Sequence, residues 1–79
     1  MTLHLSLYST EHCHLCEQAI ELIDLALAEQ DVQYKVIDIV ESATLLALYE
    51  FKIPVLKRED TNAEICWPFN IQEINRLVS

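Results

Sequence analysis

The chain has 79 residues, no glycine, and 13 acidic against 5 basic residues, which gives a formal net charge of −8. This length fits a single domain over residues 1–79, and a hydrophobic fraction of 52 % is typical of a globular chain and not of a disordered one. The acidic surplus argues against nucleic acid or an anionic membrane surface as a partner, because phosphate binding depends on clustered Lys and Arg.

The N-terminal third predicts a strand followed by an amphipathic helix. Leu3, Leu5 and Leu7 alternate with more polar residues, which is the period of a strand. From Cys13 onward, apolar side chains recur at helical spacing along about four turns. This stripe consists of Cys16, Ile20, Ile23 and Leu27.

A second strand and a short helix are expected in the middle of the chain. Residues 33–39 are rich in β-branched and aromatic side chains, which favours a strand. Ser42 follows, and its hydroxyl can accept a hydrogen bond from an otherwise unpaired backbone N–H. We therefore expect Ser42 to cap a helix that runs through Tyr49.

A hairpin is predicted next. Residues 53–57, with Pro54 near their start, form the third strand, and residues 63–67 form the fourth. The charged segment 58–62 connects them. In a chain without glycine, Asn62 is the residue that best tolerates a left-handed turn position.

Asn70 and Glu73 have the spacing of a capping box, which predicts the start of the last helix. Its apolar face consists of Ile71, Ile74, Leu77 and Val78. The element order is therefore β-α-β-α-β-β-α. Strands separated by helices run parallel through right-handed crossovers, whereas the last two strands form the hairpin. We expect an α/β fold with a four-stranded mixed sheet and helices on both faces.

Two of the three cysteines form a CxxC motif at the start of the first helix. There the unpaired backbone N–H groups and the positive end of the helix dipole stabilise a thiolate. Cys16 lies one turn after Cys13, close enough to attack a mixed disulfide formed at Cys13. Cys13 is the expected exposed nucleophile, and Cys16 the more buried resolving thiol. His12 and His14 add positive charge beside Cys13 when they are protonated.

At these residues the chain resembles the glutaredoxin branch of the thioredoxin superfamily over almost its whole length. The matching segments are Leu7-Tyr8-Ser9-Thr10, Cys13-His14-Leu15-Cys16, Ile53-Pro54-Val55-Leu56 and Cys66-Trp67-Pro68-Phe69. The resemblance implies a thioredoxin fold, thiol–disulfide exchange at the two cysteines, and a cis Ile53–Pro54 bond that faces them. It also implies that substrate pairs with the backbone at Ile53 as an added strand. We assign Ile53, Pro54, His14 and Trp67 to substrate binding.

The departures from this family concern glutathione. Glutathione-dependent members place a Gly-Gly pair after the fourth strand, where backbone N–H groups approach the tripeptide. Here Cys66 and Trp67 occupy that region, and Pro68 has no N–H to donate. A basic residue ahead of Cys13 is missing as well. We expect no tightly bound cofactor, and these departures disfavour glutathione without excluding it.

Other interpretations of the cysteines remain open. Cys13 and Cys16 can pack as small hydrophobic residues, or can bind zinc or copper together with His12 and His14. Structural zinc usually takes four ligands from two separated pairs, and no second pair is present, so we assign no metal site. Cys66 is expected to be a buried strand residue instead of a third redox centre.

The sequence thus predicts a thiol–disulfide oxidoreductase that works by dithiol exchange through Cys13 and Cys16. The alternative is a thioredoxin-fold module that binds a metal or a partner without turnover. Protein disulfides and an external reductant are the expected partners, and the chain is expected to be a monomer. No apolar run approaches the roughly 20 residues of a membrane span and no signal peptide is recognised, so a cytoplasmic location is expected.

Overall fold

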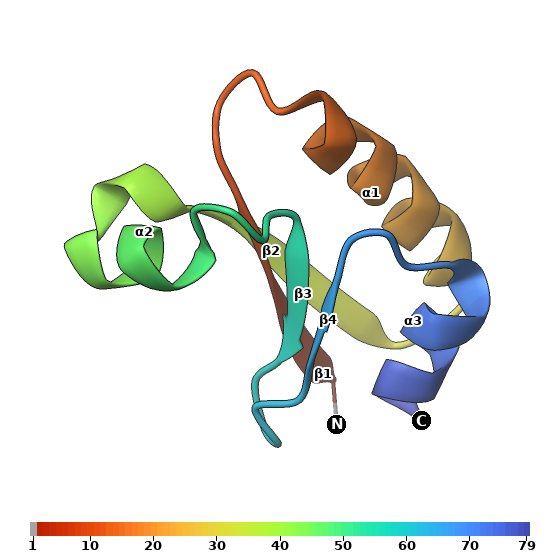
Figure 1. Cartoon of the computed structure of the whole chain (residues 1–79). Helices are drawn as coiled ribbons and strands as arrows, with labels where there is room; N and C mark the ends of the chain where they lie inside the picture. The colour runs from red at the N-terminus through yellow and green to blue at the C-terminus, as the bar shows by residue number, and fades with distance from the viewer. Residues whose placement is uncertain (1) are drawn as a thin grey trace.

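The computed structural model describes residues 2–79 and confirms the predicted order of elements, with one short turn of 3-10 helix added (Figure 1). The elements are β1 (Leu3–Ser9), α1 (His14–Ala26), β2 (Val32–Asp38), the 3-10 turn η1 (Ile39–Glu41), α2 (Ala43–Tyr49), β3 (Val55–Arg58), β4 (Glu64–Cys66) and α3 (Ile71–Val78).

The four strands form one mixed sheet in the order β2-β1-β3-β4. β1 pairs parallel with β2 and antiparallel with β3, and β4 completes the hairpin with β3. A parallel pair needs a long crossover, which α1 supplies between β1 and β2. Helices α1 and α3 pack on one face of the sheet, and α2 lies against the other (Figure 1). The expected α/β architecture is confirmed.

The hydrophobic core has two parts because β1 alternates between the two faces of the sheet. Leu5 and Leu7 are fully buried beneath α1 and α3, where Ile23 and Ile74 contact them. On the other face, Tyr8 belongs to a smaller cluster with residues of η1, α2 and β3. The rings of Tyr8 and Tyr49 stack with their centroids 4.4 Å apart and 12° between their planes, which fixes α2 to the sheet.

The helix starts lie where the capping residues predicted them. Ser42 Oγ accepts a hydrogen bond from the N–H of Leu45 (3.3 Å), and Asn70 Oδ1 accepts one from the N–H of Glu73 (2.8 Å). Such caps replace an intrahelical partner that the first turn lacks, and each is worth about 1 kcal/mol.

The strand boundaries differ from the sequence prediction because neighbouring groups set them. The predicted strand 33–39 ends at Asp38. The Asp38 carboxylate accepts a hydrogen bond from the N–H of Val40, so Asp38 is the N-cap of η1. The predicted strand 53–57 begins only at Val55 and extends to Arg58, which pairs with Leu5.

The fourth strand and its turn show how the hairpin closes. The predicted strand 63–67 is reduced to Glu64–Cys66. Asn62 adopts the left-handed conformation expected of it, with φ at 63°. Asparagine tolerates this region better than most residues, so the turn needs no glycine.

The described residues also settle one point about the helices. Among residues 2–79, no helix combines the length and the apolar character that crossing a membrane requires.

Two aliphatic residues of α1, one buried and one exposed, provide a test of the core. Ile23→Ala removes a fully buried side chain and should lower the free energy of unfolding by about 2–5 kcal/mol, since a cavity is left behind. Leu25→Ala, on the exposed side of the same helix, should change it by only about 0.5 kcal/mol. Urea denaturation of both variants checks this, and equal losses would contradict the assignment of the core.

Candidate active site

The segments expected to form the site meet at one edge of the sheet. The parallel strands β1 and β2 both end at this edge. β3 is antiparallel to β1 and therefore begins there, and β4 is antiparallel to β3 and ends there. The loop that leads from β1 into α1 lies at the top of Figure 1, above the start of β3. The topology thus brings Cys13, Pro54 and Trp67 to the same end of the molecule.

Cys13 and Cys16 occupy unequal positions at the start of α1. Cys13 is the N-cap residue, and its Sγ accepts a hydrogen bond from the N–H of Cys16 at 3.2 Å. The two sulfurs form a disulfide, with the Cα atoms 5.1 Å apart. Cys13 is half-buried, whereas Cys16 is only 2 % exposed because it begins the stripe that packs on the sheet. A reactant from solvent can therefore reach the sulfur of Cys13 more easily than that of Cys16.

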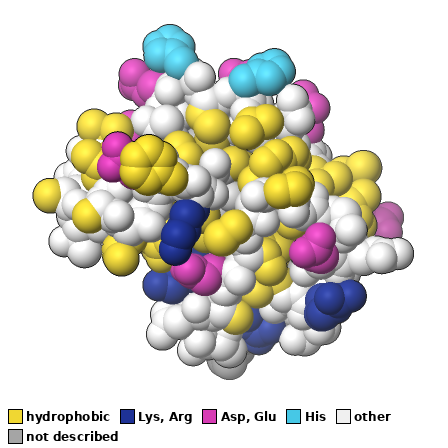
Figure 2. All heavy atoms as spheres, in the orientation of Figure 1, with side chains coloured by type: hydrophobic (Ala, Val, Ile, Leu, Met, Phe, Trp, Pro, Cys, Tyr) yellow, Lys and Arg dark blue, Asp and Glu magenta, His cyan; other side chains and the backbone are white. Residues whose placement is uncertain are grey.

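Histidines flank this pair and point to solvent. His12, just before Cys13, adopts a left-handed conformation with φ at 58°, which is uncommon for a residue other than glycine and was not predicted. His14 Nδ1 lies 3.7 Å from Glu17 Oε2, and both side chains are largely exposed. Histidine side chains stand out at this end of the molecule in Figure 2, with acidic side chains beside them. Protonated His14 therefore has a carboxylate neighbour that offsets its charge.

The Ile53–Pro54 segment lies at the start of β3. The bond between these residues is cis, and Pro54 is fully buried. The N–H of Ile53 donates to the carbonyl of Tyr49 at 3.2 Å. Within residues 2–79 the carbonyl of Ile53 has no hydrogen-bond partner, so it is the backbone group that remains available for an added strand. Sequence reasoning did not reveal that the N–H is already used.

Trp67 joins the end of β4 to the same region. Its backbone N–H donates to the carbonyl of Pro54 at 3.0 Å. Its ring packs edge to face against that of Phe69, with the centroids 5.2 Å apart. The indole is half-buried and packs against the core beneath α1 and α3. The Trp67–Pro68 bond is cis as well, which was not predicted. Trp67 therefore presents only part of its side chain to solvent.

The expectation that Cys66 is buried is wrong, since its thiol is free and exposed. β4 is an edge strand, and Cys66 pairs with Val55, so both side chains lie on the face that α2 covers. Helix α2 is only seven residues long, and although its Tyr49 reaches Glu64 of β4, it leaves the thiol of Cys66 exposed. Ile65, which points to the other face, is the residue of β4 that packs under the longer helices.

Tyr49 connects α2 to this edge strand. Its hydroxyl donates to Glu64 Oε2 at 2.8 Å. Burial of the phenol, together with its bond to the Glu64 carboxylate, raises the pKa of Tyr49 to about 12, because both disfavour the tyrosinate. The neutral side chain thus holds α2 against β4 beside the site.

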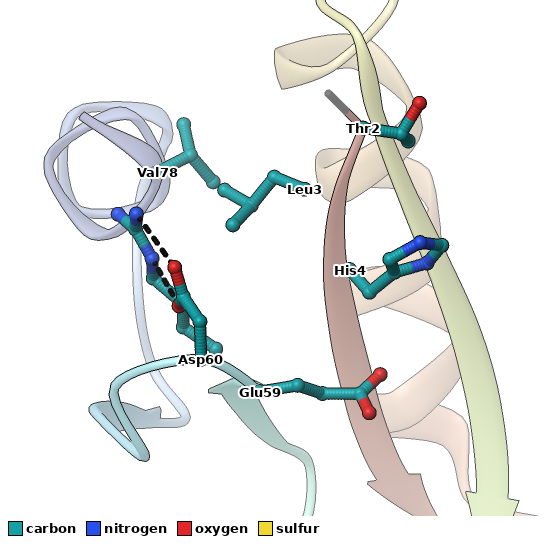
Figure 3. A pocket seen from close by; sticks show the side chains of 7 residues that line it. Thr2, Leu3, His4, Glu59, Asp60 and Val78 are labelled. Atoms are coloured by element: carbon teal, nitrogen blue, oxygen red, sulfur yellow. Dashed lines mark hydrogen bonds and ion pairs between the residues drawn. The ribbon is translucent and has the colours of Figure 1, made fainter.

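A concavity lies at the opposite end of the sheet and takes no part in this arrangement (Figure 3). It measures about 560 Å³ and lies between the start of β1 and the end of α3. Arg58 there donates to the carbonyl of Leu77, in the last turn of α3, at 2.9 Å. It also donates to Asp60 at 2.7 Å, and this hydrogen bond holds the pKa of the Asp60 carboxyl below its usual value. Among residues 2–79, no group of three or more His, Cys, Asp or Glu side chains is arranged to hold a metal ion.

Comparisons with known proteins agree with this geometry. The model of the glutaredoxin-like domain (DUF836) matches residues 4–79. No curated protein sequence matches the chain. A structural genomics target protein from X. campestris, solved by X-ray crystallography, is 31 % identical, with a TM-score of 0.81 over 94 % of this chain and 93 % of that one.

More distant structures extend the likeness. The NMR structure of a protein from Nitrosomonas europaea is 27 % identical, with a TM-score of 0.83 over 96 % of this chain and 91 % of that one. Thioredoxin 1 from Thermosipho africanus is 19 % identical, with a TM-score of 0.70 over 95 % and 89 % of the two chains, which shows a shared fold. The expected thioredoxin fold and the resemblance to the glutaredoxin-like branch are confirmed.

The exposure of the three cysteines predicts a simple thiol count. The oxidised protein should expose one reactive thiol to a thiol-titrating reagent, because Cys13 and Cys16 are bonded to each other and Cys66 is free. Cys66→Ser should leave none until a reductant is added. Slow or absent reaction of the native, oxidised protein would contradict the exposed position of Cys66.

The raised pKa of the buried Tyr49 phenol can be tested by titration. The chain has three tyrosines, and the tyrosinate absorbance should include two groups that ionise near pH 12, Tyr34 and Tyr49, of which Tyr49→Phe removes one. Because the folded pKa lies above the unfolded value of about 10, the stabilisation from this phenol is complete below pH 10 and is lost as the pH rises toward 12. At neutral pH the same variant should lose about 1 kcal/mol of stability. A titration curve that Tyr49→Phe leaves unchanged would rule this out.

Proposed function

The chain belongs to the glutaredoxin-like family, and on that premise we propose that it is a thiol–disulfide oxidoreductase that works by dithiol exchange through Cys13 and Cys16. The observation that carries the proposal is the cysteine pair at the start of α1, bonded within one helical turn and unequal in exposure.

The reaction proceeds in two exchanges. The Cys13 thiolate attacks one sulfur of a target disulfide, forms a mixed disulfide, and releases the other target sulfur as a thiolate that takes up a proton. The Cys16 thiolate then attacks Cys13 Sγ and releases the second target thiol. The target gains two electrons and two protons, and the protein is left with the Cys13–Cys16 disulfide. An external thiol reductant returns it to the dithiol.

The local structure supports this order of attack. Cys13 is the N-cap residue, and its Sγ accepts a hydrogen bond from the backbone N–H of Cys16. The other N–H groups of the first turn have no partner within the helix. Hydrogen bonds of this kind favour a thiolate over a thiol. Cys16 lies beneath it on the buried side of the helix, where it is shielded from solvent but within one turn of the mixed disulfide. We therefore propose Cys13 as the nucleophile and Cys16 as the resolving thiol.

Substrate is proposed to bind along the edge where these segments meet. The free carbonyl of Ile53 supports strand pairing through a donor N–H of the substrate, with Pro54 fixing the backbone. His14 and Trp67 border this position from α1 and from the end of β4. Protein disulfides are the substrates proposed for this edge.

No tightly bound cofactor is proposed. The chain has no glycine, so it lacks the Gly-Gly backbone with which glutathione-dependent relatives hold the tripeptide. Its charge of −8 also disfavours an anionic ligand. We further propose a monomer that works in the cytoplasm, where a thiol reductant is available.

Substitution of each cysteine tests the proposal. Cys13→Ser should abolish reduction of a protein disulfide, because the attacking sulfur is lost. Cys16→Ser should retain the first exchange and accumulate mixed disulfides on Cys13, which mass spectrometry of the trapped protein identifies.

Cys66→Ser is the matched control, since it removes a thiol on the same edge that the reaction does not use. Its rate should stay within about twofold of the unchanged protein. If Cys13→Ser keeps full activity, or if Cys66→Ser loses it, dithiol exchange at the CxxC pair is excluded. Zinc that copurifies in stoichiometric amount and is lost on Cys16→Ser would favour the binding module instead.

A further inference from the structure

The large hydrophobic side chains that remain exposed are not spread evenly over the molecule. Among residues 2–79, half of them lie on the unit formed by η1, α2 and the turn that follows, and we call these three residues the α2 surface. They are Val40, Leu48 and Phe51, with exposures of 62 %, 55 % and 94 %. Leu48 lies in the last turn of α2, and Phe51 follows two residues after the helix ends at Tyr49.

Helix α2 differs in composition from the rest of this acidic chain. Its seven residues, ATLLALY, carry no charge, although 23 % of the whole chain is charged. One side packs on the sheet through Leu45, Leu46 and Tyr49. An ordinary surface helix carries mostly polar residues on its other side, but here only one exposed residue, Thr44, is polar, and the others are Ala43, Ala47 and Leu48. Exposed apolar side chains gathered on one short segment are typical of an interaction site.

The α2 surface adjoins the substrate edge. Phe51 stands two residues before Ile53, and the N–H groups of Lys52 and Ile53 both donate to the carbonyl of Tyr49, at 2.8 and 3.2 Å. These bonds hold the turn that carries Phe51 directly beside the backbone where substrate is proposed to pair. Hydrophobic side chains spread across this face from α2 toward the start of α1 in Figure 2. On the α1 side, Leu15 between the two cysteines is 46 % exposed.

The border of this apolar surface is acidic. Glu41 and Glu50 are exposed on the α2 side, and Glu11 and Glu17 are exposed on the side of the CxxC loop. Lys52 is the cation beside Phe51. A second copy of the chain would bring the same acidic border and another −8 charge against it, which opposes self-association. A segment that is apolar in its middle and basic at its ends matches both the surface and its border.

We propose that the α2 surface is a specificity site that docks the polypeptide next to the cysteine of a target disulfide, and that it selects segments carrying apolar and basic side chains. The proposal rests on the proposed function and names its substrate class. Phe51 packs on an apolar side chain of the target, while the carboxylates around it attract Lys and Arg. The target disulfide is thereby held over Cys13.

Two peptides and a small disulfide test this selection. Each peptide is closed by one intramolecular disulfide. One has Leu, Phe and Lys next to its cysteines, and the other has Ser and Glu there. Hydroxyethyl disulfide is the small probe, since it is too short to reach α2. Pre-reduced protein is mixed with each, and the second-order rate constant is taken from the appearance of reduced product after an acid quench.

The unchanged protein should reduce the apolar, basic peptide about tenfold faster than the acidic one, and added salt should shrink this advantage. Phe51→Ser should lower the ratio of the peptide rate to the hydroxyethyl disulfide rate at least about fivefold. Leu25→Ser is the matched control, because Leu25 is 67 % exposed on the outer side of α1 and lies outside the α2 surface. It should leave that ratio unchanged.

Several outcomes would overturn the proposal. If Phe51→Ser lowers both rates equally, or if Leu25→Ser has the same effect, the surface does not select substrate. A dimer in sedimentation that Phe51→Ser dissociates would show that a second copy covers it. If hydroxyethyl disulfide is reduced but the two peptides react alike, only the substrate class fails. If none of the three disulfides is reduced, the proposed function fails as well.

Discussion

The structure depends on strand β1, which is hydrogen-bonded to a neighbour on each side and covered on each face. Its alternation sends Leu5 and Leu7 into the larger core and Tyr8 into the smaller one. Since β2 is parallel to it and β3 antiparallel, the end of β1 coincides with the start of β3. The chain must therefore leave β1 beside Pro54, and the cysteine motif that follows at once lies at the same edge of the sheet as Ile53 and Pro54.

Helix α1 turns this placement into a chemical difference between two identical side chains. A separation of three residues puts Cys16 on the stripe that continues through Ala19 and Ile23 into the core. Cys13 remains at the cap, where it meets both the backbone N–H of Cys16 and solvent. The unequal exposure of the two sulfurs thus follows from the helical period and from the side of the helix that packs on the sheet.

The absence of glycine also shapes the backbone of the chain. Left-handed positions are filled by Asn62 in the hairpin turn and by His12 directly before Cys13. A histidine in this region costs conformational energy, which the surrounding structure must supply, and such positions gather at functional sites. The apolar α2 surface and its acidic border lie at the end of the molecule that carries the cysteines, whereas the concavity around Arg58 lies at the far end.

The sequence by itself determined the order of elements, the starts of α2 and α3, the CxxC motif at a helix start, and the left-handed Asn62. These features depend on local signals, because a cap such as Ser42 or Asn70 acts within its own first turn. The ends of strands depended on distant partners, so the predicted limits were off by one or two residues. The exposure of Cys66 was decided by how far the short α2 extends over an edge strand, and the use of the Ile53 N–H was decided by the turn after Tyr49. Neither feature can be read from the local sequence pattern. The exposure of Cys66 depends on an element far away in the chain, and the use of the Ile53 N–H depends on how the turn after Tyr49 closes, so only the folded structure shows them.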